Sequence, residues 1–125
     1  MENSSYRVSA PISLNGVHDI TICAYSINGG LCPCIDLVNC CNVHITQCEL
    51  LNSAQMGIKL TSCANIIIDN CYVANVSSGI HSVNGVNIHV KNNKMKKLAP
   101  NGVWVKFECL GAGTVKASSC EIGNN

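Results

Sequence analysis

The sequence predicts an all-β fold, a right-handed parallel β-helix (a solenoid) of about five stacked coils. Three observations predict it: a segment that recurs every 22 to 27 residues, period-two alternation of apolar residues within each copy, and a core that must form almost without aromatic side chains. The chain has 125 residues, of which 47% are hydrophobic and 4% aromatic. This composition suits one domain whose core is filled by Ile, Val, Leu and small residues.

The repeat is visible in a direct alignment. Residues 35–48 match residues 58–71 at an offset of 23, and further copies begin at Ile12, Ile80 and Val103. Each copy is too small to bury its own apolar face, so neighbouring copies must stack with equivalent residues about 4.8 Å apart.

Each copy contains two short apolar alternations, Ile-x-Leu and Val-x-Ile, separated by a polar turn of about five residues. Alternation with period two predicts β-strands. Copies close at a glycine, as at Gly57 and Gly79. We therefore expect the β-helix to cover residues 12–125, preceded by an N-terminal tail or partial capping strand at residues 1–11.

The segment from Asn42 to Cys48, Asn-Val-x-Ile-x-x-Cys, and the Gly-Ile at residues 79–80 resemble the repeat of the right-handed parallel β-helix proteins of the pectate-lyase-like superfamily. The resemblance covers residues 12–125. It implies the fold, but that superfamily includes lyases, hydrolases, epimerases, phage tailspikes and non-catalytic surface proteins. Because many of these act outside the cell, we expect an extracellular or cell-surface location, although no signal segment opens this chain.

Stacking converts the repeat into vertical columns of equivalent residues. Two of these columns are polar, and one of them looks like the inward ladder of Asn or Cys known in that superfamily. We interpret both as hydrogen-bonded structural turns. The first column contains Tyr25, Cys48, Cys71, Asn93 and Cys120, and the second contains Asp19, Asn42, Asn65 and Asn87.

One outward column combines residue types that could support acid–base chemistry on a sugar. It contains Asp36, Lys59, His81 and Trp104. Asp36 or His81 would exchange a proton, Lys59 would supply a positive charge, and Trp104 would stack on a sugar ring. The alternative interpretation is an exposed column in which unlike charges neighbour one another.

The acidic residues argue against catalysis. Glycosidases that invert configuration need two carboxyl groups about 6.5 to 9.5 Å apart, but the seven acids are spread over different columns and the only Arg is Arg7. We therefore predict a non-catalytic structural or assembly module, either a head-to-tail filament subunit or a segment of a longer cell-surface protein. The alternative is a carbohydrate-active (polysaccharide lyase or glycoside hydrolase) or polysaccharide-binding β-helix.

Ten cysteines raise the question of a metal site. Cys32 and Cys34 flank a proline and Cys40 is followed by Cys41, but this spacing matches no paired Cys-x-x-Cys motif. We expect no metal and no other cofactor. Free buried thiols that act as small apolar fillers and disulfides between stacked cysteines both remain open.

Charge and hydropathy limit the partners. Eight Lys and Arg with a net charge of +1 make no basic surface large enough for nucleic acid. The apolar runs are a few residues long, so we expect no membrane span. Open solenoid ends favour self-association, and a polysaccharide is the alternative partner.

Overall fold

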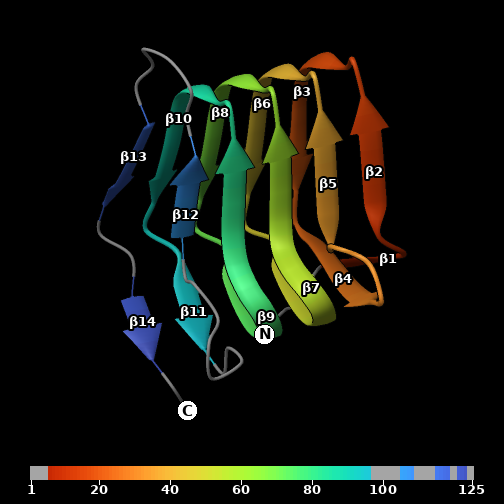
Figure 1. Ribbon diagram of the computed structural model, residues 1–125. Helices are drawn as coiled ribbons and strands as arrows, with labels where there is room; N and C mark the ends of the chain where they lie inside the picture. The colour runs from red at the N-terminus through yellow and green to blue at the C-terminus, as the bar shows by residue number, and fades with distance from the viewer. Residues whose placement is uncertain (1–5, 97–104, 109–114, 119–120, 124–125) are drawn as a thin grey trace.

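A computed structural model of the protein describes residues 6–96, 105–108, 115–118 and 121–123. Within these residues the chain forms strands joined by turns, and every pairing between strands is parallel (Figure 1). No helix that could span a membrane occurs in this described part. The strands are β1 (Arg7–Ser9), β2 (Ile12–Asn15), β3 (His18–Cys23), β4 (Tyr25–Gly30), β5 (Ile35–Val38), β6 (Cys41–Thr46), β7 (Glu49–Thr61), β8 (Ala64–Asp69), β9 (Tyr72–Val83), β10 (Val86–Lys91), β11 (Lys94–Lys96), β12 (Val105–Glu108), β13 (Val115–Ser118) and β14 (Glu121–Gly123).

The strands form two sheets that wrap around one core. Sheet B consists of β3, β6, β8, β10 and β13, whereas sheet A contains the other nine strands and covers two faces, because β7 and β9 bend (Figure 1). Strands from five successive turns stack in register, from β2, β3 and β4 in the first to β12, β13 and β14 in the last. The predicted all-β solenoid is confirmed.

Each coil contains three strand segments, one more than the sequence pattern indicated. The residues that close a coil before Gly57 or Gly79 form the first halves of β7 and β9. Apolar alternation is broken there by Asn52 and Asn75, whose backbones are left-handed. The third segment therefore has no clean period-two signal in the sequence.

Gly57 and Gly79 lie one above the other at the bend of sheet A. A Cβ atom on Gly57 would lie 2.9 Å from the carbonyl oxygen of Gly79 and 2.9 Å from Cγ1 of Val73. Both contacts are too short for carbon, so the bend requires glycine at this position.

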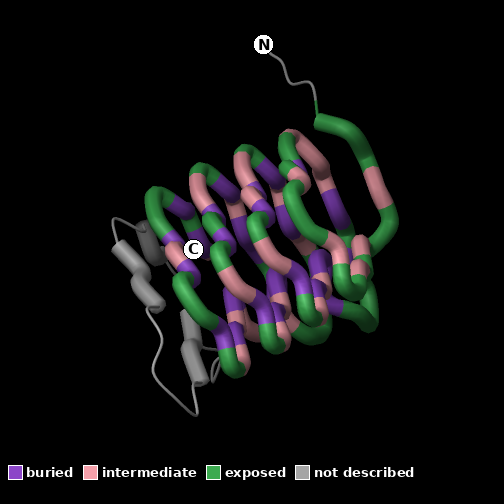
Figure 2. The backbone as a smooth tube through the Cα atoms, turned by 90° about the horizontal axis from the view of Figure 1, so that it is seen from above, coloured by how far each residue is buried: buried purple, intermediate pink, exposed green. Residues whose placement is uncertain are grey.

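The core is built from columns of aliphatic side chains that touch their equivalents in adjacent coils. Ile35, Ile58 and Ile80 form one column and are fully buried. Figure 2 shows that buried residues recur at the same places in successive coils. Each buried Ile or Leu stabilises the fold by roughly 1.5 to 3 kcal/mol.

Left-handed backbone conformations turn the chain at regular positions. Thirteen non-glycine residues have positive φ, between 52° and 62°, and nine of them are asparagine. Asparagine tolerates this region better than other side chains except glycine, which explains the Asn-rich sequence. Three of the recurring positions in the coil are occupied by Asn39, Ser62 and Asn84; by Asp19, Asn42, Asn65 and Asn87; and by Ala24, Gln47, Asn70 and Asn92.

We expect Asn39→Ala to destabilise the protein by about 1 kcal/mol, because alanine is strained in the left-handed region, whereas Asn39→Gly is nearly neutral. Asn39 is exposed and has a φ of 55°. Urea unfolding followed by circular dichroism measures the difference. Asn15→Ala is the matched control, since Asn15 is also exposed but is not left-handed. Equal effects of alanine at both positions would contradict the assignment.

Candidate functional site

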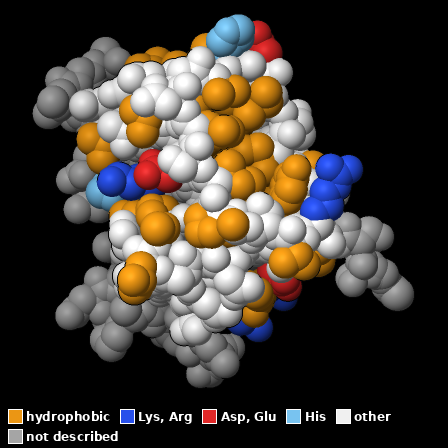
Figure 3. Space-filling view, turned by 90° about the vertical axis from the view of Figure 1, so that its right-hand side faces the viewer, with side chains coloured by type: hydrophobic (Ala, Val, Ile, Leu, Met, Phe, Trp, Pro, Cys, Tyr) orange, Lys and Arg blue, Asp and Glu red, His pale blue; other side chains and the backbone are white. Residues whose placement is uncertain are grey.

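Strand pairing brings together three residues of the predicted acid–base column. Asp36 of β5 pairs with Lys59 of β7, and Lys59 pairs with His81 of β9. All three side chains are half-buried. Figure 3 shows acidic, basic and histidine side chains adjoining on a surface made mostly of uncharged groups. Oδ1 of Asp36 is buried without a hydrogen-bond partner within the described part of the chain.

The fourth predicted member, Trp104, lies outside the described residues. The position paired with His81 belongs to Lys106 of β12, because Ile80 pairs with Val105. The alignment that began the last copy at Val103 is therefore wrong by two residues. Ile80 and Val105 are 25 residues apart, whereas Ile58 and Ile80 are 22 apart, so the chain between the fourth and fifth coils is longer than the alignment assumed.

Buried cysteines act as hydrogen-bond donors that join adjacent coils. Cys40, Cys48, Cys63 and Cys71 are each at most 2% exposed. The thiol of Cys63, for example, donates to the carbonyl oxygen of Thr61 at 3.5 Å and to that of Leu37, one coil away, at 3.4 Å. These thiols therefore fill the core and also satisfy backbone acceptors.

Asn93 stands above Cys71 in the same buried column and makes equivalent contacts. Its Nδ2 donates to the carbonyl oxygen of Ile68 at 3.0 Å, and its Oδ1 accepts from the backbone N–H of Cys71 at 2.9 Å. Cys48 and Cys71 are its neighbours in the ladder, and Cys120, predicted next, lies outside the described residues. Asn42, Asn65 and Asn87 form the second polar column, but they lie within β6, β8 and β10 and are exposed.

We expect Asn93→Leu to destabilise the fold by about 3 kcal/mol, because it leaves a buried N–H and a buried carbonyl without partners. Asn93→Cys is expected to lose less, since the Cys48 and Cys71 thiols already donate to carbonyls at equivalent positions. Guanidinium unfolding measures both. A smaller loss for leucine than for cysteine would refute the role of the ladder.

The described cysteines do not converge on a metal site. All eight have free thiols, with Cys34 and Cys40 buried, Cys32 exposed and Cys41 half-buried. Burial raises the pKa of the Cys34 thiol to about 11. No group of three or more His, Cys, Asp or Glu side chains placed to hold a metal ion is found within the described ranges.

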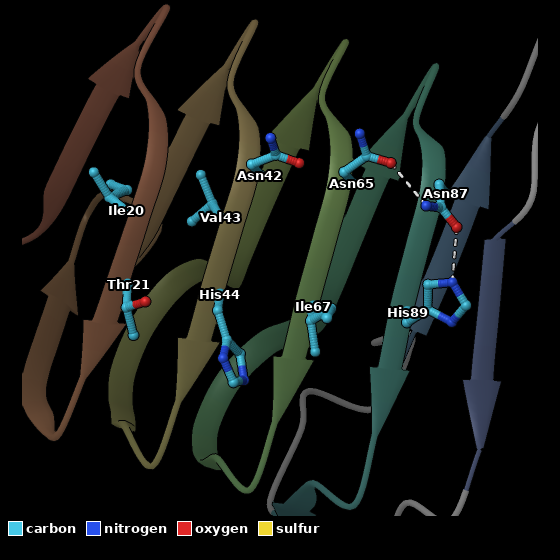
Figure 4. A pocket seen from close by; sticks show the side chains of 9 residues that line it. All are labelled: Ile20, Thr21, Asn42, Val43, His44, Asn65, Ile67, Asn87 and His89. Carbon is cyan, nitrogen blue, oxygen red and sulfur yellow. Dashed lines mark hydrogen bonds between the residues drawn. The ribbon is translucent and has the colours of Figure 1, made fainter.

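A groove that the sequence patterns did not indicate lies on the outer surface of sheet B. It has a volume of about 470 Å³, and its walls combine amide, imidazole and aliphatic side chains (Figure 4). Thr21, His44, Ile67 and His89 form one outward column along it. The full lining consists of Ile20, Thr21, Asn42, Val43, His44, Asn65, Ile67, Asn87 and His89.

His44 is held by a nearly buried carboxylate. Its Nε2 lies 2.8 Å from Oδ1 of Asp69, and the two side chains are 41% and 14% exposed. Burial alone would raise the pKa of Asp69, but hydrogen bonds from Thr46 and His44 and the positive charges of His44 and Lys91 together hold this pKa below its ordinary value. Asp69 is therefore ionised at neutral pH and accepts the Nε2 proton of His44, so Nδ1 of the neutral ring remains available as an acceptor.

His89 is oriented by a chain of amides at the other end of the groove. Nδ2 of Asn87 donates to Oδ1 of Asn65 at 2.7 Å, so Oδ1 of Asn87 is the acceptor for Nε2 of His89 at 2.8 Å (Figure 4). The sequence did carry a signal for this surface. Thr21, His44 and Ile67 recur at the 23-residue offset, one residue after the inward position of the second strand.

The chain belongs to the family described as right handed beta helix region, whose model matches residues 10–125. Comparison with curated proteins and with solved structures gave no match. The family establishes the handedness and the solenoid architecture. Chemistry must be argued from the sites themselves.

Proposed function

We propose that the protein is a structural assembly module whose ends stack on those of further copies, head to tail. The observation that carries this proposal is the apolar surface of the first coil. Ile12 and Leu14 are only half-buried, whereas their equivalents Ile35 and Leu37 in the next coil are completely buried. Figure 3 views this end and shows apolar side chains running across it.

Both ends of the solenoid offer strand edges on the same three faces. At one end β1, β2 and β3 each pair with a single strand, and at the other end β12, β13 and β14 do so. A second copy in the same orientation would pair its β12 with β2, its β13 with β3 and its β14 with β1. The coil outline is common to both ends, so a second copy is the partner that fits best, and the contact is heterologous.

Backbone groups at the first coil favour such pairing. The N–H groups of Ile12 and Gly16 donate to Cys34 and Val38 of the next coil, both at 2.9 Å. Because N–H groups alternate in direction along a strand, that of Ser13 points away from the molecule along the solenoid axis. Such an edge is a template for another strand.

The distribution of acids also supports a structural role. The four acids whose side chains are described, Asp19, Asp36, Glu49 and Asp69, occupy four different columns. Stacking therefore aligns no two of these carboxyl groups, although glycoside hydrolysis requires such a pair.

The expected result in sedimentation velocity and electron microscopy is that particles grow with concentration in multiples of 13.3 kDa. Ser13→Pro removes only the outward N–H group, so we expect a folded monomer with an unchanged circular dichroism spectrum. Ser13→Ala keeps that N–H group and is the matched control, for which assembly should persist. A wild-type chain that stays monomeric at every concentration, or Ser13→Pro assembling normally, would overturn the proposal.

A second candidate function is a carbohydrate-active face on sheet A. It is favoured by the buried, unpartnered Oδ1 of Asp36 beside Lys59, because a carboxylate without a fixed partner has a lone pair for a substrate proton. The expected result is turnover of an acidic polysaccharide that is lost in Asp36→Ala and in His81→Ala. Turnover that is unchanged in both variants would exclude this face.

A further inference from the structure

We propose that the groove of sheet B is a hydrolytic site in which His44, oriented by Asp69, acts as a general base on small uncharged carboxylic esters. This inference is independent of head-to-tail assembly, because the groove lies on the side of the solenoid and its ends are not involved. It also involves a different sheet from Asp36, Lys59 and His81.

The first argument is the orientation of the base. Asp69 fixes Nε2 of His44 at 2.8 Å and is itself 14% exposed, so the imidazole is held in one tautomer by a carboxylate that is mostly removed from water. Nδ1 is then the acceptor on a ring that is partly open to the groove. A neutral imidazole is well suited to accept a proton near neutral pH.

The second argument is the chemistry of the groove around that base. Ile67 is 37% exposed beside His44, and Ile20 and Val43 contribute further apolar lining, which favours an uncharged substrate. Oδ1 of Asn65 accepts from Asn87, whereas its Nδ2 makes no hydrogen bond within the described part of the chain. That amide is a free donor for an oxygen on which negative charge develops.

The reaction needs water as its only co-reactant. Nδ1 of His44 accepts a proton from water while the water oxygen bonds to the ester carbonyl carbon, and the carbonyl electron pair moves onto oxygen near Asn65. Collapse of this adduct breaks the bond to the alkoxide, which takes the proton back from His44, giving an acid and an alcohol. The transient imidazolium is stabilised by the carboxylate of Asp69. Thr21 makes no hydrogen bond to His44 within the described residues, so the nucleophile is water.

The test measures hydrolysis of 4-nitrophenyl acetate by the full chain, with the urea-unfolded chain as the baseline for free imidazole groups. We expect the folded protein to exceed that baseline and His44→Gln to lose the excess, a decrease on the order of 100-fold. His18→Gln removes an exposed histidine that bonds Asp19 outside the groove, and it should keep the full rate. Circular dichroism confirms that each variant is folded. A wild-type rate equal to the baseline, or a His44→Gln rate equal to wild type, would overturn the proposal.

Asp69→Asn separates positioning from folding. An amide binds either imidazole tautomer, so we expect the rate to fall and the nitrogen-15 NMR spectrum of His44 to change from one tautomer to a mixture. A structural role for Asp69 would change stability without changing the tautomer. An unchanged tautomer with an unchanged rate would show that Asp69 does not orient the base.

Discussion

The constraint on which this structure depends is the parallel register that places each residue over its equivalent one coil away. Ile35, Ile58 and Ile80 are completely buried only because the coils keep that register. A slip by one residue would send every inward side chain to the surface. Left-handed residues such as Asn39 and Asn84 make the register possible, because they turn the chain within a single residue and keep the coils equal in length.

The sequence predicted what this register repeats and failed where the repeat is imperfect. The isoleucine column and the Asp36 to Lys59 pairing follow directly from the 23-residue offset. The third strand segment was missed because the left-handed Asn52 interrupts its alternation of apolar and polar residues. The position of Trp104 was misassigned because the last coil begins two residues later than its apolar pattern indicates.

The groove on sheet B shows a second limit of reading columns. An alignment places residues directly above one another, so it pairs His44 with Ile67. The contact of His44 is instead with Asp69, two residues further along the neighbouring strand, because its long side chain reaches diagonally across the sheet. Diagonal contacts depend on side-chain rotamers as well as on the register, and a repeat alignment contains no information about rotamers.

Assembly and chemistry would then arise from the same register without competing for surface. The ends offer backbone edges, whereas the groove uses side chains that point away from sheet B. Stacking a second copy would bring its β13 beside β3, where the position of Lys116 would continue the column of Thr21, His44, Ile67 and His89. In a filament the groove of each subunit would therefore have a lysine position of its neighbour at one end, and this basic position would repeat once per subunit.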